Sequence, residues 1–198
     1  MQDWLGIVAA ARVGGWVVYP LTLLAVLSIA ITLDRAYVFA RFAGFPRESV
    51  DRLPEQHAIR RIIKALGSTG LMPLWLREAK AQSEAVHIER DMARGLWVLE
   101  TIVTAAPLLG LLGTIVGMMH SFQLFGGPRL VDPGGVTGGV AQSLVATAIG
   151  LVVALISLFA FNYFSRRLER TMDDLEAFAT ERLSEIRLAQ ETSPEEAQ

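Results

Sequence analysis

Residues 97–124 read WVLETIVTAAPLLGLLGTIVGMMHSFQL, and this stretch decides the fold. Apart from Glu100 near its start, it contains no Asp, Glu, Lys or Arg. The runs 13–33 and 133–165 are equally free of these residues. A helix needs about 20 consecutive apolar residues to cross the hydrocarbon core of a bilayer. The sequence therefore predicts three transmembrane helices, at residues 14–38, 97–124 and 138–164.

The composition also indicates a membrane protein. Of the 198 residues, 52% are hydrophobic and 19% are charged, whereas soluble domains carry about 25% charged residues. The formal net charge of -2 gives no reason to expect a nucleic-acid partner. The chain has no cysteine, and His57, His87 and His120 lie far apart in sequence. We therefore expect no disulfide, metal site or cofactor, and no catalytic triad or phosphate-binding loop indicates an enzyme.

The distribution of Lys and Arg predicts the orientation. Apart from Arg12 and Arg129, all Lys and Arg residues lie between Arg35 and Arg94 or in the stretch that begins at Arg166, and these two stretches are predicted to be cytoplasmic. Because cytoplasmic loops carry the excess of Lys and Arg, we expect the N-terminus outside and the C-terminus inside. The predicted fold class is an all-α membrane protein with three transmembrane helices and long cytoplasmic helical extensions. Residues 1–13 and 125–137 are extracytoplasmic in this topology.

The cytoplasmic segments are predicted to be helical as well. Within residues 39–96, the Gly-Ser-Thr-Gly run at 67–70 separates two helical pieces. No strong stop follows, and Gly95 is the only weak point, so the second piece is predicted to continue into the second span as one long helix. Residues 165–190 have the amphipathic pattern of a helix that extends the third span. The polar residues 191–198 are predicted to form a disordered tail.

Polar and small residues recur at steps of three and four along the second and third spans, which places them on defined helix faces. The predicted ion-path residues are Glu100, Thr104, Thr114, Gln142, Ser143 and Thr147. Small residues at this spacing let helices approach closely in lipid. The predicted helix-packing residues are Pro107, Gly110, Gly113, Gly117 and Gly150. Thr114 and Thr147 are expected at the same depth, about 15 Å below the outer surface.

Some of these residues have a second interpretation in the sequence. A threonine or serine in a membrane helix can return its hydroxyl to a backbone carbonyl, which is a structural role. Glu100 can complement the helix macrodipole or attract cations to a pore entrance. No Asp, Glu, Lys or Arg lies at mid-membrane depth in any span. A proton relay needs an ionisable group there, so a partner would have to supply the carboxylate.

Two runs carry a family resemblance. Residues 106–118 (APLLGLLGTIVGM) resemble the second-span motif of the ExbB/TolQ/MotA family, and residues 140–151 (VAQSLVATAIGL) resemble the third-span motif of ExbB and TolQ. The resemblance implies a pentameric ring in the bacterial inner membrane around an ExbD- or TolR-like single-span partner that carries one membrane aspartate. Thr114 and Thr147 match threonines that line the family's ion path. Gln142 stands where ExbB and TolQ usually have a glutamate, and an amide cannot titrate.

The resemblance predicts the ring subunit of a rotary motor driven by protons or sodium ions, which transmits ion-motive force to the cell envelope. The alternative is a non-conducting membrane scaffold that assembles with a partner and holds it, with the ion path broken at Gln142. The predicted partners are further copies of the chain, the ExbD- or TolR-like protein and the lipid bilayer.

Overall fold

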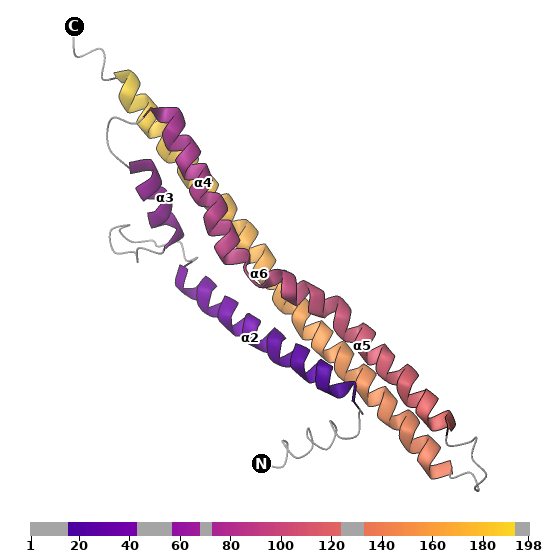
Figure 1. Ribbon diagram of the computed structural model, residues 1–198. Coiled ribbons are helices and arrows are strands. Elements are labelled where there is room, and N and C mark those ends of the chain that lie inside the picture. The colour runs from indigo at the N-terminus through magenta and orange to yellow at the C-terminus, as the bar shows by residue number, and fades with distance from the viewer. Residues whose placement is uncertain (1–15, 43–56, 68–72, 124–132, 193–198) are drawn as a thin grey trace. The chain divides into compact units, whose positions relative to one another are not determined.

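The computed structural model describes residues 16–42, 57–67, 73–123 and 133–192 (Figure 1). Every regular element in these ranges is an α-helix, which confirms the predicted all-α class. The helices are α2 (Val18–Phe42), α3 (Ala58–Gly67), α4 (Leu74–Ala93), α5 (Leu96–Gln123) and α6 (Pro133–Thr192).

Three helical stretches are long and apolar enough to cross a membrane, within Val18–Ala40, Leu74–Phe122 and Thr137–Leu188. Each of them overlaps one of the three predicted spans. Much of their apolar surface is exposed: Leu108 and Phe159, for example, are 66% and 68% accessible. A helix with exposed apolar side chains suits lipid as its surroundings. The prediction of three helices capable of spanning a membrane is therefore confirmed.

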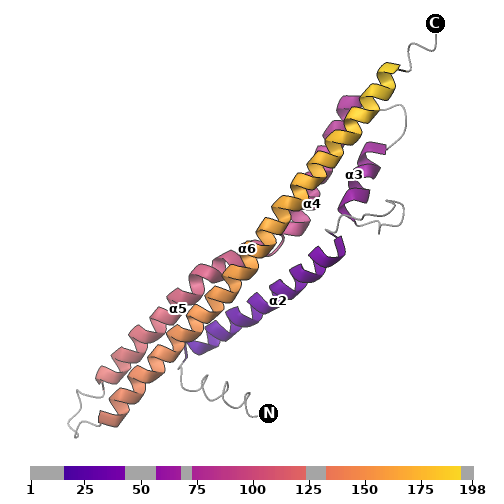
Figure 2. The ribbon, with the colours of Figure 1, turned by 180° about the vertical axis from the view of Figure 1, so that it is seen from behind.

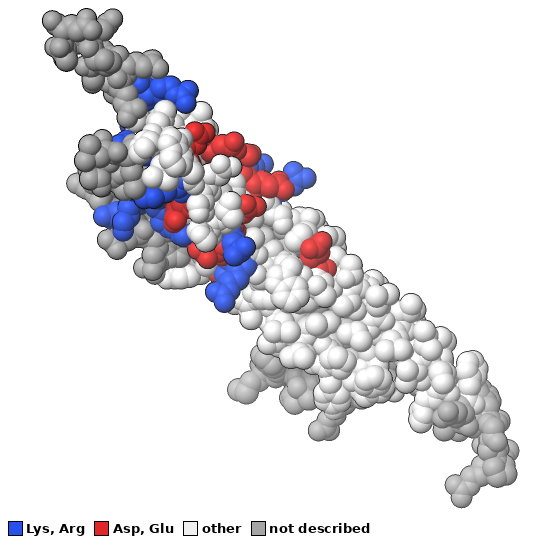
Figure 3. Space-filling view, turned by 45° about the horizontal axis from the view of Figure 1, so that its top comes forward, with Lys and Arg blue, Asp and Glu red and all other residues white. Residues whose placement is uncertain are grey.

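The chain folds as two compact units, one formed by residues 1–32 and 95–162 and the other by residues 33–94 and 163–198. We call them the apolar unit and the charged unit. Among the described residues of the apolar unit, Glu100 is the only Asp, Glu, Lys or Arg. Blue and red side chains accordingly gather over the elements of the charged unit in Figure 3.

The apolar unit is a bundle of α2, α5 and the first half of α6. Its core joins all three helices and contains Val17, Leu21, Ile102, Ala106, Val153 and Ala154. Figures 1 and 2 show α5 alongside the first half of α6 from opposite sides. Two helices joined by a short connection pack antiparallel in this way.

The charged unit contains α3, α4 and the end segments of α2 and α6. The amphipathic helix α3 packs against α4 and buries Ile59, Ile62 and Leu66. The rings of Phe39 in α2 and Phe164 in α6 stack with centroids 5.5 Å apart. The charged unit thus has its own apolar contacts.

The boundary between α4 and α5 differs from the prediction. A single long helix was expected there, but α4 ends at Ala93 and α5 begins at Leu96. Between them Gly95 has φ +85°. Glycine adopts this left-handed conformation without a steric penalty, and such a residue commonly ends a helix. The prediction of one continuous helix is therefore wrong.

Other boundaries differ by a few residues. α6 begins at Pro133, inside the predicted loop 125–137, because proline suits the first turn of a helix. It continues to Thr192, so the first two residues of the predicted tail 191–198 are helical. The N-terminal segment 1–13, the loop residues 124–132 and the tail residues 193–198 lie outside the described residues.

Candidate ion-path site

Glycines hold α5 against α6 in the apolar unit. A Cβ atom on Gly110 would lie 2.9 Å from Thr147 Cα, and one on Gly117 would lie 2.6 Å from Ser143 Cβ. A Cβ atom on Gly150 would lie 2.5 Å from the Ala106 carbonyl oxygen. Side chains larger than hydrogen do not fit at these separations. We call this contact the α5–α6 seam.

Thr147 adds a hydrogen bond across the seam. Its Oγ1 donates to the Gly110 carbonyl at 2.8 Å, and its side chain is half-buried. Thr147 is therefore level with Gly110. Gly110 precedes Thr114 by four residues, which corresponds to about 6 Å along α5. The two threonines were expected at one depth, but within a chain they differ by about one turn. The estimate was in error because the helix ends were displaced from the predicted positions.

The other small residues of α6 also lie inside the bundle. Ser143 is buried against Gly117 and donates its hydroxyl proton to the Val140 carbonyl at 2.7 Å. Gly150 is buried against Ala106. The structure thus places Ser143, Thr147 and Gly150 in contacts within one chain. Their proposed participation in an ion path remains a prediction.

The polar face of α5 is more open. Glu100 and Thr104 are exposed, and Thr114 is half-buried. The Thr104 hydroxyl donates to the Thr101 carbonyl at 2.9 Å, and the Thr114 hydroxyl donates to the Leu111 carbonyl at 2.7 Å. Both hydroxyl protons are thus used within the helix. Each oxygen can still accept a hydrogen bond through its lone pairs.

Gln142 lies away from this open face. It lines a hollow of about 230 Å³ together with His120, Ser143 and Gly117. The structure therefore places Glu100, Thr104 and Thr114 on the more open face of α5. Ser143 and Thr147 lie in the seam, and Gln142 lies in the hollow, which Ser143 also lines. Pro107 lies inside α5, which continues through it to Gln123.

A serine pair in the same bundle was not predicted. Ser28 Oγ of α2 and Ser157 Oγ of α6 lie 2.7 Å apart, and both side chains are buried. Ser157 also donates to the Val153 carbonyl at 2.8 Å, so Ser28 is the donor within the pair. The available signal was that Ser28 is a polar residue amid the apolar run 21–33.

No metal site is expected from the sequence. In the ranges that the structure describes, no group of three or more His, Asp or Glu side chains is placed to hold a metal ion.

The sequence was compared with known families. The profile of the MotA/TolQ/ExbB proton channel family matches residues 52–177. The chain belongs to this family. Its membership places it among the proton channels of the ExbB/TolQ energy-transducing systems. Together with the three apolar helices, it identifies a multi-pass inner-membrane protein.

Individual relatives agree with this assignment. The chain is 32% identical over 174 residues to a Synechocystis biopolymer transport protein called ExbB-like 3, covering 76% of this chain and 81% of the relative. It is 31% identical over 106 residues to the biopolymer transport protein ExbB of Aquifex aeolicus, covering 52% and 72%. It is 34% identical over 115 residues to the Tol-Pal system protein TolQ of Pseudomonas aeruginosa, covering 57% and 50%.

The two runs that resemble the MotA/TolQ/ExbB family face each other in the structure. Gly110 and Gly117 from 106–118 meet Thr147 and Ser143 from 140–151. The motifs that identify this family member are thus the two sides of the α5–α6 seam.

Proposed function

We propose that this protein is the ring subunit of a motor driven by protons or sodium ions, with five copies around the membrane helices of an ExbD- or TolR-like partner. The observation that carries the proposal is the polar face of α5 in an otherwise apolar unit. Glu100 and Thr104 are exposed there. A lipid-facing position is unfavourable for a carboxylate, whereas the water-filled interior of a ring accommodates it.

The ring would place the segments of the chain as follows. Spans 14–38, 97–124 and 138–164 cross the inner membrane, with residues 1–13 and 125–137 on the outer side. Residues 39–96 and 165–198 lie in the cytoplasm. The excess of Lys and Arg in these two segments supports this orientation.

The partner would supply the charge that the spans lack. Glu100 is the only Asp, Glu, Lys or Arg among the described residues of the apolar unit, and it lies in the first turns of α5. A carboxyl group crossing an apolar environment is stable mainly in its protonated form. The Thr114 hydroxyl donates its hydrogen bond to the Leu111 carbonyl, so its oxygen can accept a hydrogen bond from a protonated carboxyl through its lone pairs. Thr114 would therefore stabilise the neutral state of the partner's aspartate.

Thr147 and Gln142 have different roles in this proposal. The Thr147 hydroxyl holds α6 to α5 through Gly110 and presents its remaining lone pairs to water or to the partner. Gln142 donates and accepts hydrogen bonds in its hollow without carrying charge, so it adjusts ion transfer rather than performing it. Ion flow would drive rotation of the ring relative to the partner, which passes the work to the cell envelope.

A second candidate function is a non-conducting scaffold. The specific observation in its favour is Gln142, which occupies the position of the glutamate that ExbB and TolQ usually have. On this alternative the chain assembles with the partner and holds it without ion flow.

Proton flux into liposomes separates the two functions. The chain would be co-purified with its single-span partner, and native mass spectrometry would verify five copies of the 21.6 kDa subunit. Thr114→Val should lower flux about tenfold, because it removes one hydrogen bond to the carboxyl while keeping the shape. Thr22→Val is the matched control, since Thr22 is exposed on α2 and also donates to the carbonyl three residues earlier.

The outcomes are distinct. The motor is supported if Thr114→Val lowers the proton flux and Thr22→Val leaves it within twofold of the wild type. An intact wild-type complex without proton or sodium flux supports the scaffold instead. If an intact complex that carries both Thr114→Val and Thr147→Val keeps full flux, neither threonine takes part in the ion path.

A further inference from the structure

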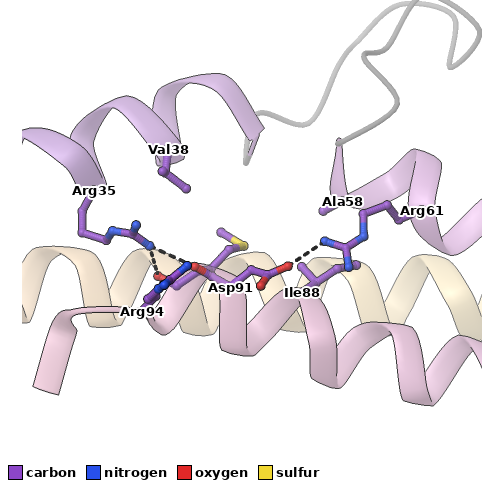
Figure 4. Close-up of a pocket in the computed structure, with 8 residues that line it drawn as sticks. Arg35, Val38, Ala58, Arg61, Ile88, Asp91 and Arg94 are labelled. Atoms are coloured by element: carbon purple, nitrogen blue, oxygen red, sulfur yellow. Dashed lines mark hydrogen bonds and ion pairs between the residues drawn. The ribbon is translucent and has the colours of Figure 1, made fainter.

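Three arginines from different elements line one cavity of the charged unit. The cavity has a volume of about 380 Å³ and contains Arg35 of α2, Arg61 of α3 and Arg94, which follows α4. Figure 4 shows Arg35 and Arg61 pointing toward Asp91 from opposite sides, with Arg94 beside it. Asp91 is the only carboxylate among the lining residues, so the lining carries a net positive charge.

Arg35 is fixed in position by hydrogen bonds. Its side chain is buried, and Nη1 donates to the carbonyls of Asp91 and Met92 at 2.9 and 3.2 Å. These carbonyls belong to the last turn of α4, where backbone oxygens have no partner within the helix. Nε and Nη2 both donate to the carboxylate of Asp34, at 3.0 and 2.5 Å. Arg35 therefore caps α4 and is held rigidly at the cavity wall.

Arg61 is held in a similar way. Its Nε donates to Glu84 at 2.6 Å and its Nη1 donates to Asp91 at 3.0 Å. Burial lowers the pKa of Arg61, but the hydrogen bonds to Glu84 and Asp91 outweigh burial and raise the pKa above its ordinary value. None of these bonds uses Nη2, which leaves donors for a further acceptor.

Arg94 differs from the other two. It is exposed and makes no hydrogen bond or ion pair with the residues that the structure describes. The carboxylates of Asp34 and Glu84, which pair with Arg35 and Arg61, do not line the cavity. The cavity thus combines two immobilised guanidinium groups with a third that has all its donors available.

We infer that this cavity binds the phosphate of an anionic phospholipid headgroup. The fixed guanidinium groups of Arg35 and Arg61 carry a permanent charge and N–H donors for phosphate oxygens, and Arg94 adds a further positive charge. Arg35 follows the charge-free run 13–33 by two residues, and Arg94 precedes α5 by two residues. Each arginine therefore lies two residues from the end of an apolar stretch. Lipid headgroups lie at the level where apolar transmembrane helices end.

Two observations favour a lipid over free phosphate. The rest of the lining is apolar and includes Val38, Ile88 and Met92, which suit the glycerol and upper acyl carbons. Trp97, in the first turn of α5, is 69% exposed. Tryptophan at a helix end is typical of the membrane interface.

Lipid binding to the purified full-length protein in neutral detergent tests the inference. The probe is dioctanoyl phosphatidylglycerol, compared by native mass spectrometry with dioctanoyl phosphatidylcholine and with inorganic phosphate. Arg94→Gln should weaken phosphatidylglycerol binding about fivefold, the effect of one arginine near a charged surface. Arg94→Lys should retain binding within twofold. Arg90→Gln is the matched control, because Arg90 is exposed in the last turn of α4, one turn before Arg94, and does not line the cavity.

Each result decides the question. The site is supported if the protein prefers phosphatidylglycerol and Arg94→Gln weakens this preference. Arg94→Lys and Arg90→Gln should both preserve it. Equal losses in Arg94→Gln and Arg90→Gln would show unspecific surface attraction and overturn it. Equal weakening by lysine and glutamine at position 94 would overturn it too, since charge would then not be the cause. Inorganic phosphate that binds as tightly as the lipid would overturn the lipid assignment.

Discussion

Gly150→Ala should destabilise the apolar unit, because it adds a methyl group to the α5–α6 seam. The new Cβ would lie 2.5 Å from the Ala106 carbonyl oxygen and 3.2 Å from Gly110 Cα, where ordinary contacts begin at 3.4 Å. Both neighbours are backbone atoms, which cannot rotate away. The helices would have to separate by about 0.9 Å, the difference between the ordinary and the available distance to the Ala106 oxygen.

The cost of this separation follows from what it disrupts. A gap of 0.5–1 Å removes roughly a quarter to a half of the dispersion energy of each contact across the seam. The bond between Thr147 Oγ1 and the Gly110 carbonyl, now 2.8 Å, would stretch beyond hydrogen-bonding distance. An interhelical bond of this kind contributes about 0.6 kcal/mol, and up to about 1.7 kcal/mol. With an overpacking cost of about 1–3 kcal/mol, the total loss is about 2–4 kcal/mol.

Gly138→Ala is the matched control for this prediction. Gly138 lies in the same helix, and a Cβ atom there would meet nothing within 4 Å. Alanine is favoured over glycine in a helix by about 1 kcal/mol, and this gain applies to both variants and cancels in their comparison. The measurement is the SDS mole fraction at half-unfolding in mixed micelles, followed by tryptophan fluorescence. Equal midpoints for Gly150→Ala and Gly138→Ala would refute the proposed register of α5 against α6.

Two further predictions concern other contacts. A double-mutant cycle of Ser28→Ala and Ser157→Ala in the same assay should give a coupling of about 0.6–1.7 kcal/mol, because the Ser28 hydroxyl donates to the Ser157 oxygen across α2 and α6; additive effects would contradict this. Arg35→Gln should lower the free energy of unfolding of the charged unit by about 3 kcal/mol, because the α4 carbonyls lose a buried charged donor. Thermal unfolding compared with Arg90→Gln checks it, and equal midpoints would show that Arg35 does not cap α4.

Several features of the fold could be predicted from local sequence. The second span was predicted at 97–124 and α5 runs from Leu96 to Gln123. Two helices were predicted on either side of the Gly-Ser-Thr-Gly run at 67–70, and α3 and α4 are separate helices, although residues 68–70 of the run lie outside the described residues. Both depend on hydropathy and turn residues over a few adjacent positions, which a single sequence contains in full.

Contacts between distant residues could not be predicted in the same way. Arg35 bonds to the carbonyl of Met92, 57 positions later, and periodicity gives no information on such a pairing. The same limit affects the site. Helical spacing placed Ser143 and Thr147 on one face of α6 but could not determine whether this face meets α5 of the same chain or the interior of a ring.

The seam constrains how ions can pass this protein. For the seam itself to conduct, α5 and α6 would have to part, and the Thr147 hydroxyl would have to leave the Gly110 carbonyl. The Thr147 hydroxyl would then lose its acceptor across the seam, at a cost of about 0.6–1.7 kcal/mol in each cycle. The exposed face at Glu100 and Thr104 requires no such separation, because the local hydroxyl bond there stays within one helix. If the proposed function is correct, the tight contact between the two family motifs is the rigid support that would hold the polar face of α5 toward the carboxyl group of the proposed partner.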